Sequence, residues 1–139
     1  MRTRLVRTAG TCFAIVFAAV GLLFLLLPAG VVSFFDRISA PWGFPPAPVE
    51  EPGLFTLLAV AYMAVVTALA WGMARRPDQP AYPRLLVLAK IASSLLSFGL
   101  FFFKTGTFIV LANGIVDGLI GGSVLWLTKP QERKRDAAI

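Results

Sequence analysis

The chain has 139 residues, of which 58% are hydrophobic and 14% are charged, and its formal net charge is +6. A soluble domain carries roughly 25% charged residues and about 45–50% apolar residues, whereas the mean hydropathy of this chain is +0.79. The composition excludes a soluble globular domain, a disordered tail and a disulfide scaffold. It indicates an integral membrane protein whose residues 1–139 form one domain.

Few residue types that carry metal or redox chemistry are present. The chain has no histidine, which argues against axial haem ligation, imidazole proton relays and most zinc or copper sites. Its one cysteine, Cys12, lies in an apolar run and has no partner for an internal disulfide or a thiolate cluster. We therefore expect no metal site and no cofactor.

The chain also lacks the residue pairings of common catalytic sites. It has no Ser–His or Cys–His pair, and no phosphate-binding glycine loop precedes a helix. Glu50 and Glu51 are adjacent in sequence, so their side chains point in different directions and form a poor acid–base pair. We expect no catalytic residues and no enzyme activity.

Four apolar segments follow one another along the chain. A helix needs about 20 such residues to cross the hydrocarbon core, and an open sheet in lipid would leave backbone groups unpaired. The sequence therefore predicts an all-α antiparallel bundle of four transmembrane helices near residues 5–27, 53–74, 85–103 and 107–128. A cleaved signal peptide is a weaker interpretation of the first segment, because its apolar run exceeds the usual 7–15 residues.

The basic residues indicate the orientation of the bundle. Arg37 and Lys104 fall on one side of the expected spans, and ten basic residues fall on the other. Those ten are Arg2, Arg4, Arg7, Arg75, Arg76, Arg84, Lys129, Arg133, Lys134 and Arg135. The positive-inside rule places both termini, including the basic tail 129–139, in the cytoplasm of a bacterial-type inner membrane. The same rule explains the basic charge better than nucleic-acid binding, which we do not expect.

The outer loop over residues 28–52 has two parts. In the first, Val31, Phe34, Phe35 and Ile38 recur at the spacing of a short amphipathic helix that lies in the membrane interface. The second part, residues 41–52, contains five prolines and predicts a stiff extended segment with Trp42 near the headgroups. The loop serves either as a lid or partner-docking element, or simply as a connector along the interface.

A short turn at residues 104–106 predicts that the last two helices form a tight hairpin. Centring that hairpin on residue 105 places Asp117 level with Ser93, and Asn113 level with Ser97. Lys90 then lies about one helical turn closer to the cytoplasm than Asp117. Because a central charge costs about 2.5–3.5 kcal/mol on insertion scales, these side chains are expected to face the protein interior.

The expected intramembrane polar cluster therefore consists of Lys90, Ser93, Ser97, Asn113, Asp117 and, through its hydroxyl, Tyr62 of the second span. Three interpretations stay open at this stage. The cluster is a structural ion pair that fixes the hairpin, a binding site or pathway for a small polar solute or proton, or a docking point for a charged partner helix.

The last span also carries a small-residue pattern, Gly114-x-x-x-Gly118-x-x-x-Gly122. Glycines at this spacing let another helix backbone approach closely. The face formed by Gly114, Gly118 and Gly122 is expected to pack within the chain, or against a second copy or a partner membrane protein.

The Arg-rich start, the first span closing in Leu27-Pro28 and the tight last hairpin resemble small four-helix bacterial proteins of the DoxX-like and neighbouring uncharacterised groups. The resemblance covers the topology of most of the chain, and it implies a four-helix membrane bundle but no site residues. We expect a non-enzymatic protein of the lipid bilayer, an accessory or interaction subunit of a membrane assembly. The alternative is a small solute or proton-coupled transporter that uses Lys90 and Asp117.

Overall fold

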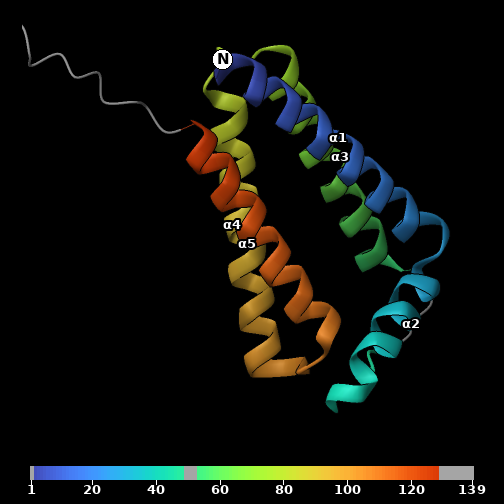
Figure 1. Ribbon diagram of the computed structural model, residues 1–139. Helices are drawn as coiled ribbons and strands as arrows, with labels where there is room; N and C mark the ends of the chain where they lie inside the picture. The colour runs from blue at the N-terminus through green and yellow to red at the C-terminus, as the bar shows by residue number, and fades with distance from the viewer. Residues whose placement is uncertain (1, 49–52, 129–139) are drawn as a thin grey trace, which may run out of the picture.

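The computed structural model describes residues 2–48 and 53–128, and within these ranges it contains helices and turns but no strand (Figure 1). The elements are α1 (Arg2–Leu26), α2 (Pro28–Ser39), the 3₁₀ turn η1 (Ala40–Trp42), α3 (Leu54–Arg75), α4 (Ala81–Leu100), the π-helical turn η2 (Phe101–Thr105) and α5 (Phe108–Thr128). Glu50, Glu51 and the tail 129–139 lie outside the described residues.

Four helices are long and apolar enough to cross a membrane. They cover Thr3–Leu26, Thr56–Arg75, Ala81–Thr105 and Phe108–Thr128. The prediction of an all-helical chain with four candidate membrane helices is confirmed at this level. The third helix begins at Ala81, earlier than the predicted residue 85, because Pro83 sits in its first turn, where a missing backbone N–H costs no hydrogen bond.

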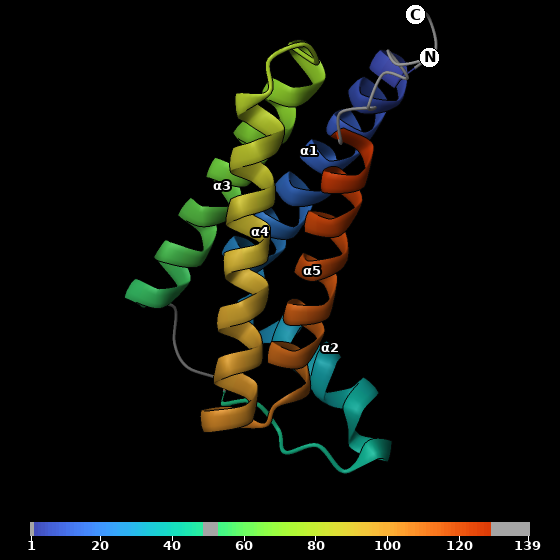
Figure 2. The same cartoon turned by 90° about the vertical axis from the view of Figure 1, so that its left-hand side faces the viewer.

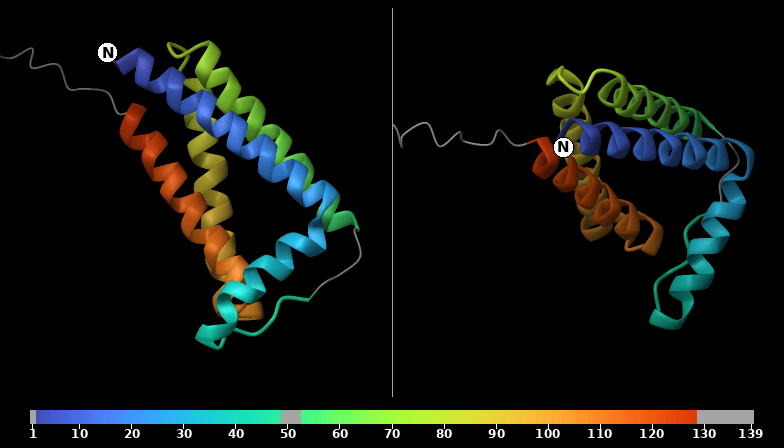
Figure 3. Two further views of the ribbon diagram at one scale, coloured as in Figure 1. Left: turned by 45° about the vertical axis from the view of Figure 1, so that its right-hand side comes forward. Right: turned by 45° about the horizontal axis from the view of Figure 1, so that its top comes forward.

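The long helices form two antiparallel hairpins. α1 packs mainly on α3, and α4 packs mainly on α5, while α3 contacts α4 and α1 contacts α5 less extensively. Figure 2 shows α4 lying between α3 and α5. The two hairpins lie close together where α1 begins and diverge toward α2, as both views in Figure 3 show.

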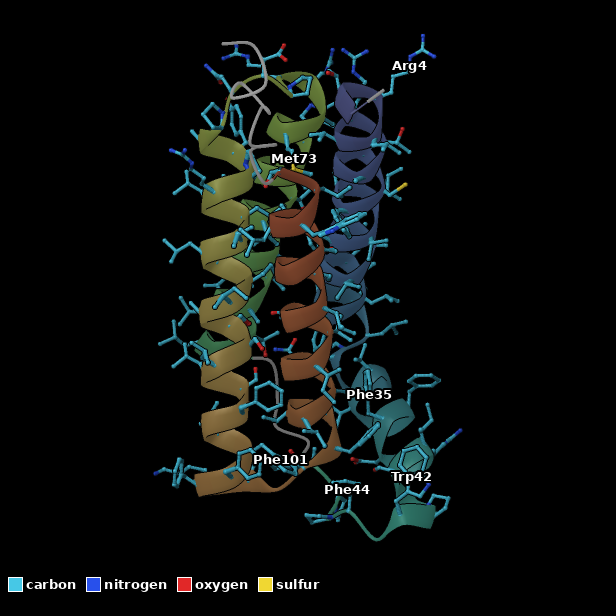
Figure 4. The ribbon with its side chains drawn as sticks, turned by 60° about the vertical axis from the view of Figure 1, so that its left-hand side comes forward. Arg4, Phe35, Trp42, Phe44, Met73 and Phe101 are labelled. Carbon is cyan, nitrogen blue, oxygen red and sulfur yellow. The ribbon has the colours of Figure 1, made fainter. Side chains whose placement is uncertain are left out.

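The two ends of this arrangement differ in composition. We call the end where α1 and α4 begin the arginine end, because it carries exposed arginines at Arg4, Arg7, Arg75, Arg76 and Arg84. We call the opposite end the aromatic end, because α2, η1 and η2 bring aromatic rings together there. Figure 4 labels Arg4 at the first end and Phe35, Trp42, Phe44 and Phe101 at the second.

All four long helices contribute to a buried core. Phe17 from α1, Met73 from α3, Leu86 from α4 and Val124 from α5 are almost completely buried. Large apolar side chains also cover the outside of the bundle, where Phe103 is 87% exposed and Trp126 is 74% exposed. An outer surface of this kind suits a hydrocarbon environment and would be unusual for a monomer in water.

The α1–α3 hairpin is tight because a glycine lies in its seam. A Cβ atom on Gly10 would lie 2.8 Å from the backbone nitrogen of Ala74 and 2.9 Å from the carbonyl oxygen of Ala70. Both neighbours are backbone atoms, so a side chain at position 10 would force the two helices apart. This is the close backbone approach that small residues allow between helices in a membrane.

The described part of the outer loop, residues 28–48, is folded, and Pro41 and Trp42, which were expected in an extended segment, form the 3₁₀ turn η1. α2 follows α1 after a break at Leu27, with Pro28 in its first turn, so it is longer than the amphipathic segment 31–38 expected from the sequence. Asp36 Oδ1 accepts a hydrogen bond of 3.1 Å from the backbone N–H of Ala47. Gly43 supports the turn after η1 with a φ of 73°, a left-handed conformation that glycine adopts without strain. The loop therefore returns along α2 toward the α4–α5 hairpin.

Candidate functional site

An ion pair joins α4 and α5 inside the bundle. Lys90 Nζ donates a hydrogen bond of 2.7 Å to Asp117 Oδ1, and the two side chains are only 3% and 5% exposed. It is the one ion pair found among residues 2–48 and 53–128. The short α4–α5 turn brings the two residues within about one helical turn in depth, as the hairpin register predicts, and the lysine side chain spans the difference. Each charge compensates the other, so neither is left alone in a medium where an unpaired ion is costly.

Lys90 also contacts the other hairpin. Its Nζ atom lies 4.4 Å from the ring centroid of Phe17 on α1 and 5.3 Å from that of Tyr62 on α3. A desolvated cation over an aromatic ring gains about 2 kcal/mol or more. Lys90 is therefore a point at which all four long helices meet.

The sequence did not single out Phe17. It lies in an apolar run between Phe13 and Phe24, and nothing in that run marks one ring as the neighbour of a lysine on another helix. The contact depends on how the two hairpins cross, which the spacing of residues within α1 does not encode.

Tyr62 lies beside the ion pair but does not hydrogen-bond to Asp117. Its hydroxyl donates a hydrogen bond of 3.0 Å to the backbone carbonyl of Ala89, and it also interacts with the half-buried Ser93 side chain. The structure therefore brings both Tyr62 and Ser93 to the cluster, on the side of α4 that faces α3. The hydrogen bond of the Tyr62 hydroxyl to Ala89 links the two hairpins next to Lys90.

Two more hydrogen bonds cross between α4 and α5 on the side of the ion pair that faces the aromatic end. Ser94 Oγ donates to the carbonyl oxygen of Gly114 at 2.7 Å, and Asn113 Nδ2 donates to Ser97 Oγ at 2.8 Å. The pairing of Asn113 with Ser97 follows the register expected from the sequence. The Ser94 bond was not predicted, because its acceptor is a backbone carbonyl that no side-chain pattern reveals.

The glycines of α5 explain how close the two helices lie. A Cβ atom on Gly114 would lie 3.3 Å from Ser97 Cβ, and one on Gly118 would lie 2.9 Å from Ser94 Oγ. A Cβ atom on Gly121 would lie 3.0 Å from Ile91 Cδ1, whereas one on Gly122 would have no neighbour within 4 Å. These glycines therefore let α4 and α5 approach at three positions, and Gly122 is not one of them.

The expected packing face needs a correction at its last position. Within the chain it consists of Gly114, Gly118 and Gly121, because residues seven apart lie within about 20° of each other around a helix. Residues eight apart are rotated by about 80°, which turns Gly122 away from α4 and exposes it.

The aromatic residues of the outer loop gather around the start of α5. The ring of Phe108 lies 5.4 Å from Trp42, 5.3 Å from Phe44 and 6.3 Å from Phe35. Phe34 stacks edge-on against Phe35 at 5.6 Å and points outward, so it is 59% exposed. Phe35 and Trp42, labelled in Figure 4, thus anchor the loop on the α4–α5 hairpin, although Trp42 is still 64% exposed.

The Lys90–Asp117 pair is closed to its surroundings, whereas Asn113, which was expected to face the interior with it, is exposed. As whole residues, Lys90 is 2% exposed and Asp117 is 4% exposed, and every buried polar side-chain atom in the described ranges has a hydrogen-bond partner. Comparison of the chain with protein-family models, curated proteins and solved structures finds no match.

Proposed function

We propose that this chain is a non-enzymatic, multi-pass protein of a bacterial-type inner membrane, and that it serves as an accessory or interaction subunit of a membrane assembly. The observation that carries the proposal is the closed Lys90–Asp117 pair. Lys90 and Asp117, the buried charged residues of the described helices, pair with each other and hold this chain together, which is the role of a structural element.

The alternative, transport of a small solute or proton through Lys90 and Asp117, requires that water or solute reach these groups and that they change partners. Their burial opposes this alternative. Lys90 lies against Asp117 and two aromatic rings, and the two cavities at the arginine end are lined by other residues. A carrier would have to break the ion pair and separate the hairpins in each cycle.

The distribution of charge supports the proposed orientation. Five exposed arginines gather at the arginine end, whereas Arg37 and Lys104 are the basic residues of the aromatic end in the described ranges. Basic residues are retained on the cytoplasmic side of membrane proteins. We therefore assign the arginine end, and with it both termini, to the cytoplasm.

The outer face of α5 supports an interaction role. Gly122 is exposed, and a side chain there would meet no atom of this chain. The exposed residues Leu119 and Trp126 lie on either side of it along the helix. A glycine flanked by large apolar residues lets a second helix approach closely, so we assign this face to a partner membrane helix or a second copy of the chain.

Purification from native membranes in a mild detergent, followed by mass spectrometry and a mass measurement of the complex, tests the proposal. We expect a defined partner, or a second copy, to accompany the wild-type chain and to be lost in Gly122→Leu. Gly99→Leu is the matched control, because Gly99 on α4 also has no neighbour within 4 Å of its Cβ position. A monomer without partners, together with solute or proton flux that depends on Asp117, would instead favour the transporter.

A further inference from the structure

A second polar feature lies far along the bundle from the ion pair, at the arginine end. It is a cavity of about 290 Å³ between α1 and α3, lined by Arg7, Thr11, Trp71, Ala74 and Arg75. Two arginines, a threonine and a tryptophan thus line one hollow at the surface of the α1–α3 hairpin. No step of the proposed structural role uses these residues.

The packing of the two helices explains why both arginines reach the same hollow. Gly10 brings α1 against the backbone of α3 at Ala70 and Ala74. Arg7 lies one turn before Gly10, and Arg75 directly follows Ala74, so their side chains leave the seam at the same level. The Thr11 hydroxyl donates a hydrogen bond of 3.0 Å to the carbonyl oxygen of Arg7, so it is already engaged within α1.

The guanidinium of Arg75 is held in place by an aromatic ring. Its Cζ atom lies 5.0 Å from the ring centroid of Trp71. Stacking on an indole uses the face of the guanidinium plane and leaves its N–H groups free at the edge. That edge carries the donors that bind carboxylate or phosphate oxygens in a bidentate manner.

Neither arginine has an acidic partner in the part of the chain that the structure describes, where the single ion pair is Lys90–Asp117. Asp78, at the same end, lines a separate cavity together with Arg84. Two free, neighbouring cations raise the local potential and favour a ligand with net negative charge. Phosphate esters fit this requirement.

The position of the cavity favours a lipid over a soluble phosphate. Arg7 and Arg75 lie close to the ends of candidate spans, and Trp71 lies one turn further in, at the level where interfacial aromatic residues gather. Along α1, Ile15 and Leu22 lie within about 40° of Thr11 around the helix and are 63% and 56% exposed. A phosphate between the arginines would therefore have an apolar surface next to it on which acyl chains can lie.

From this combination we infer that the cavity lined by Arg7, Thr11, Trp71, Ala74 and Arg75 binds the headgroup phosphate of an anionic phospholipid in the cytoplasmic leaflet. Basic hollows between transmembrane helices bind such headgroups through the same chemistry. The inference rests on the proposed membrane insertion and orientation, and it adds a ligand that the closed ion-pair cluster does not provide.

Native mass spectrometry of the purified full chain tests the inference. The wild type is titrated with phosphatidylglycerol and with phosphatidylcholine of the same acyl chains, and the Arg7→Gln/Arg75→Gln variant is treated likewise. The control is Arg4→Gln/Arg76→Gln, which removes the same charge from the same end but from residues that do not line the cavity. We expect the cavity variant to weaken phosphatidylglycerol binding by about 10-fold more than the control does, with little change for phosphatidylcholine.

Several outcomes would overturn the inference. Equal losses in the two variants would show that only the general surface charge attracts the lipid, and equal binding of both lipids would remove the selectivity. Displacement of the lipid by an equal concentration of inorganic phosphate would make a soluble phosphate the ligand. If Arg7→Gln/Arg75→Gln does not fold, Arg7→Lys/Arg75→Lys makes the same test, because lysine keeps the charge but loses bidentate geometry.

Membrane extraction separates this inference from the proposal on which it depends. Retention of the wild type in membranes washed with alkaline carbonate, combined with no lipid selectivity, refutes the lipid site alone. Release of the wild type by the wash refutes membrane insertion itself.

Discussion

Substitution of Lys90 and Asp117, singly and together, measures how the ion pair contributes to stability. In Asp117→Asn, the Lys90 ammonium stays buried without a counter-charge, and in Lys90→Met the Asp117 carboxylate does. Removal of one partner of a buried pair costs about 3–5 kcal/mol. Methionine has a length similar to that of lysine and retains apolar contact with Phe17 and Tyr62. The loss of unfolding free energy in Lys90→Met therefore reports mainly the lost charge.

The double variant is informative because it removes both charges. We expect Lys90→Met/Asp117→Asn to lose less than the sum of the two single losses, with a coupling free energy above about 2 kcal/mol. Ordinary hydrogen bonds between membrane helices couple by about 0.6 kcal/mol on average and reach about 1.7 kcal/mol at most. A coupling above that range therefore identifies a buried ion pair rather than another interhelical hydrogen bond.

Reversible unfolding in detergent micelles provides the free energies for this cycle. Lys90→Met combined with Thr128→Val is the control, because the Thr128 hydroxyl bonds carbonyl groups of its own helix. Thr128 also lies eleven residues beyond Asp117, or about 16 Å along α5, so these losses should add to within about 0.5 kcal/mol. Additive losses for Lys90→Met and Asp117→Asn as well would refute the Lys90–Asp117 ion pair.

Two further predictions concern orientation and helix packing. Reporter fusions after Gln79 and after Ile139 should both report the cytoplasm and one after Pro48 the outside, because the arginine end carries the basic excess; a C-terminal reporter on the outside would contradict the assigned orientation. Gly10→Ala should destabilise by about 1–3 kcal/mol, since its Cβ would meet α3 backbone, whereas Gly122→Ala should be neutral or gain up to about 1 kcal/mol from helix propensity. Equal effects of the two alanine substitutions on the unfolding free energy would show that α1 and α3 are not held at the distance that the structure gives.

The contacts within the last hairpin could be predicted from the sequence, because a short turn determines their register. Counting from residue 105 places Asn113 level with Ser97 and Lys90 within about one helical turn of Asp117, and both pairs form. The insertion cost of a lone charge supplied the reason for burial. Where chain geometry leaves one register, sequence spacing translates directly into contacts.

The contacts between the hairpins could not be predicted in this way. Nothing in the apolar run of α1 marks Phe17 as the ring above Lys90, because the choice depends on the angle at which the hairpins cross. The packing face of α5 ends at Gly121 rather than at the predicted Gly122 for a related reason. Three glycines in one helix fit two faces, and only the rotation of α5 relative to α4 decides between them.

The difference between contacts within a hairpin and contacts between hairpins also explains why Lys90 matters to the architecture beyond its pairing with Asp117. In lipid, apolar faces gain little by leaving the hydrocarbon, so helices associate through close packing and polar contacts. Each hairpin has an extensive glycine-lined seam, but the hairpins meet each other over a smaller contact. At that contact Lys90 touches Phe17 and Tyr62 of one hairpin while it pairs with Asp117 of its own. Lys90 therefore lies where the two halves of the bundle join.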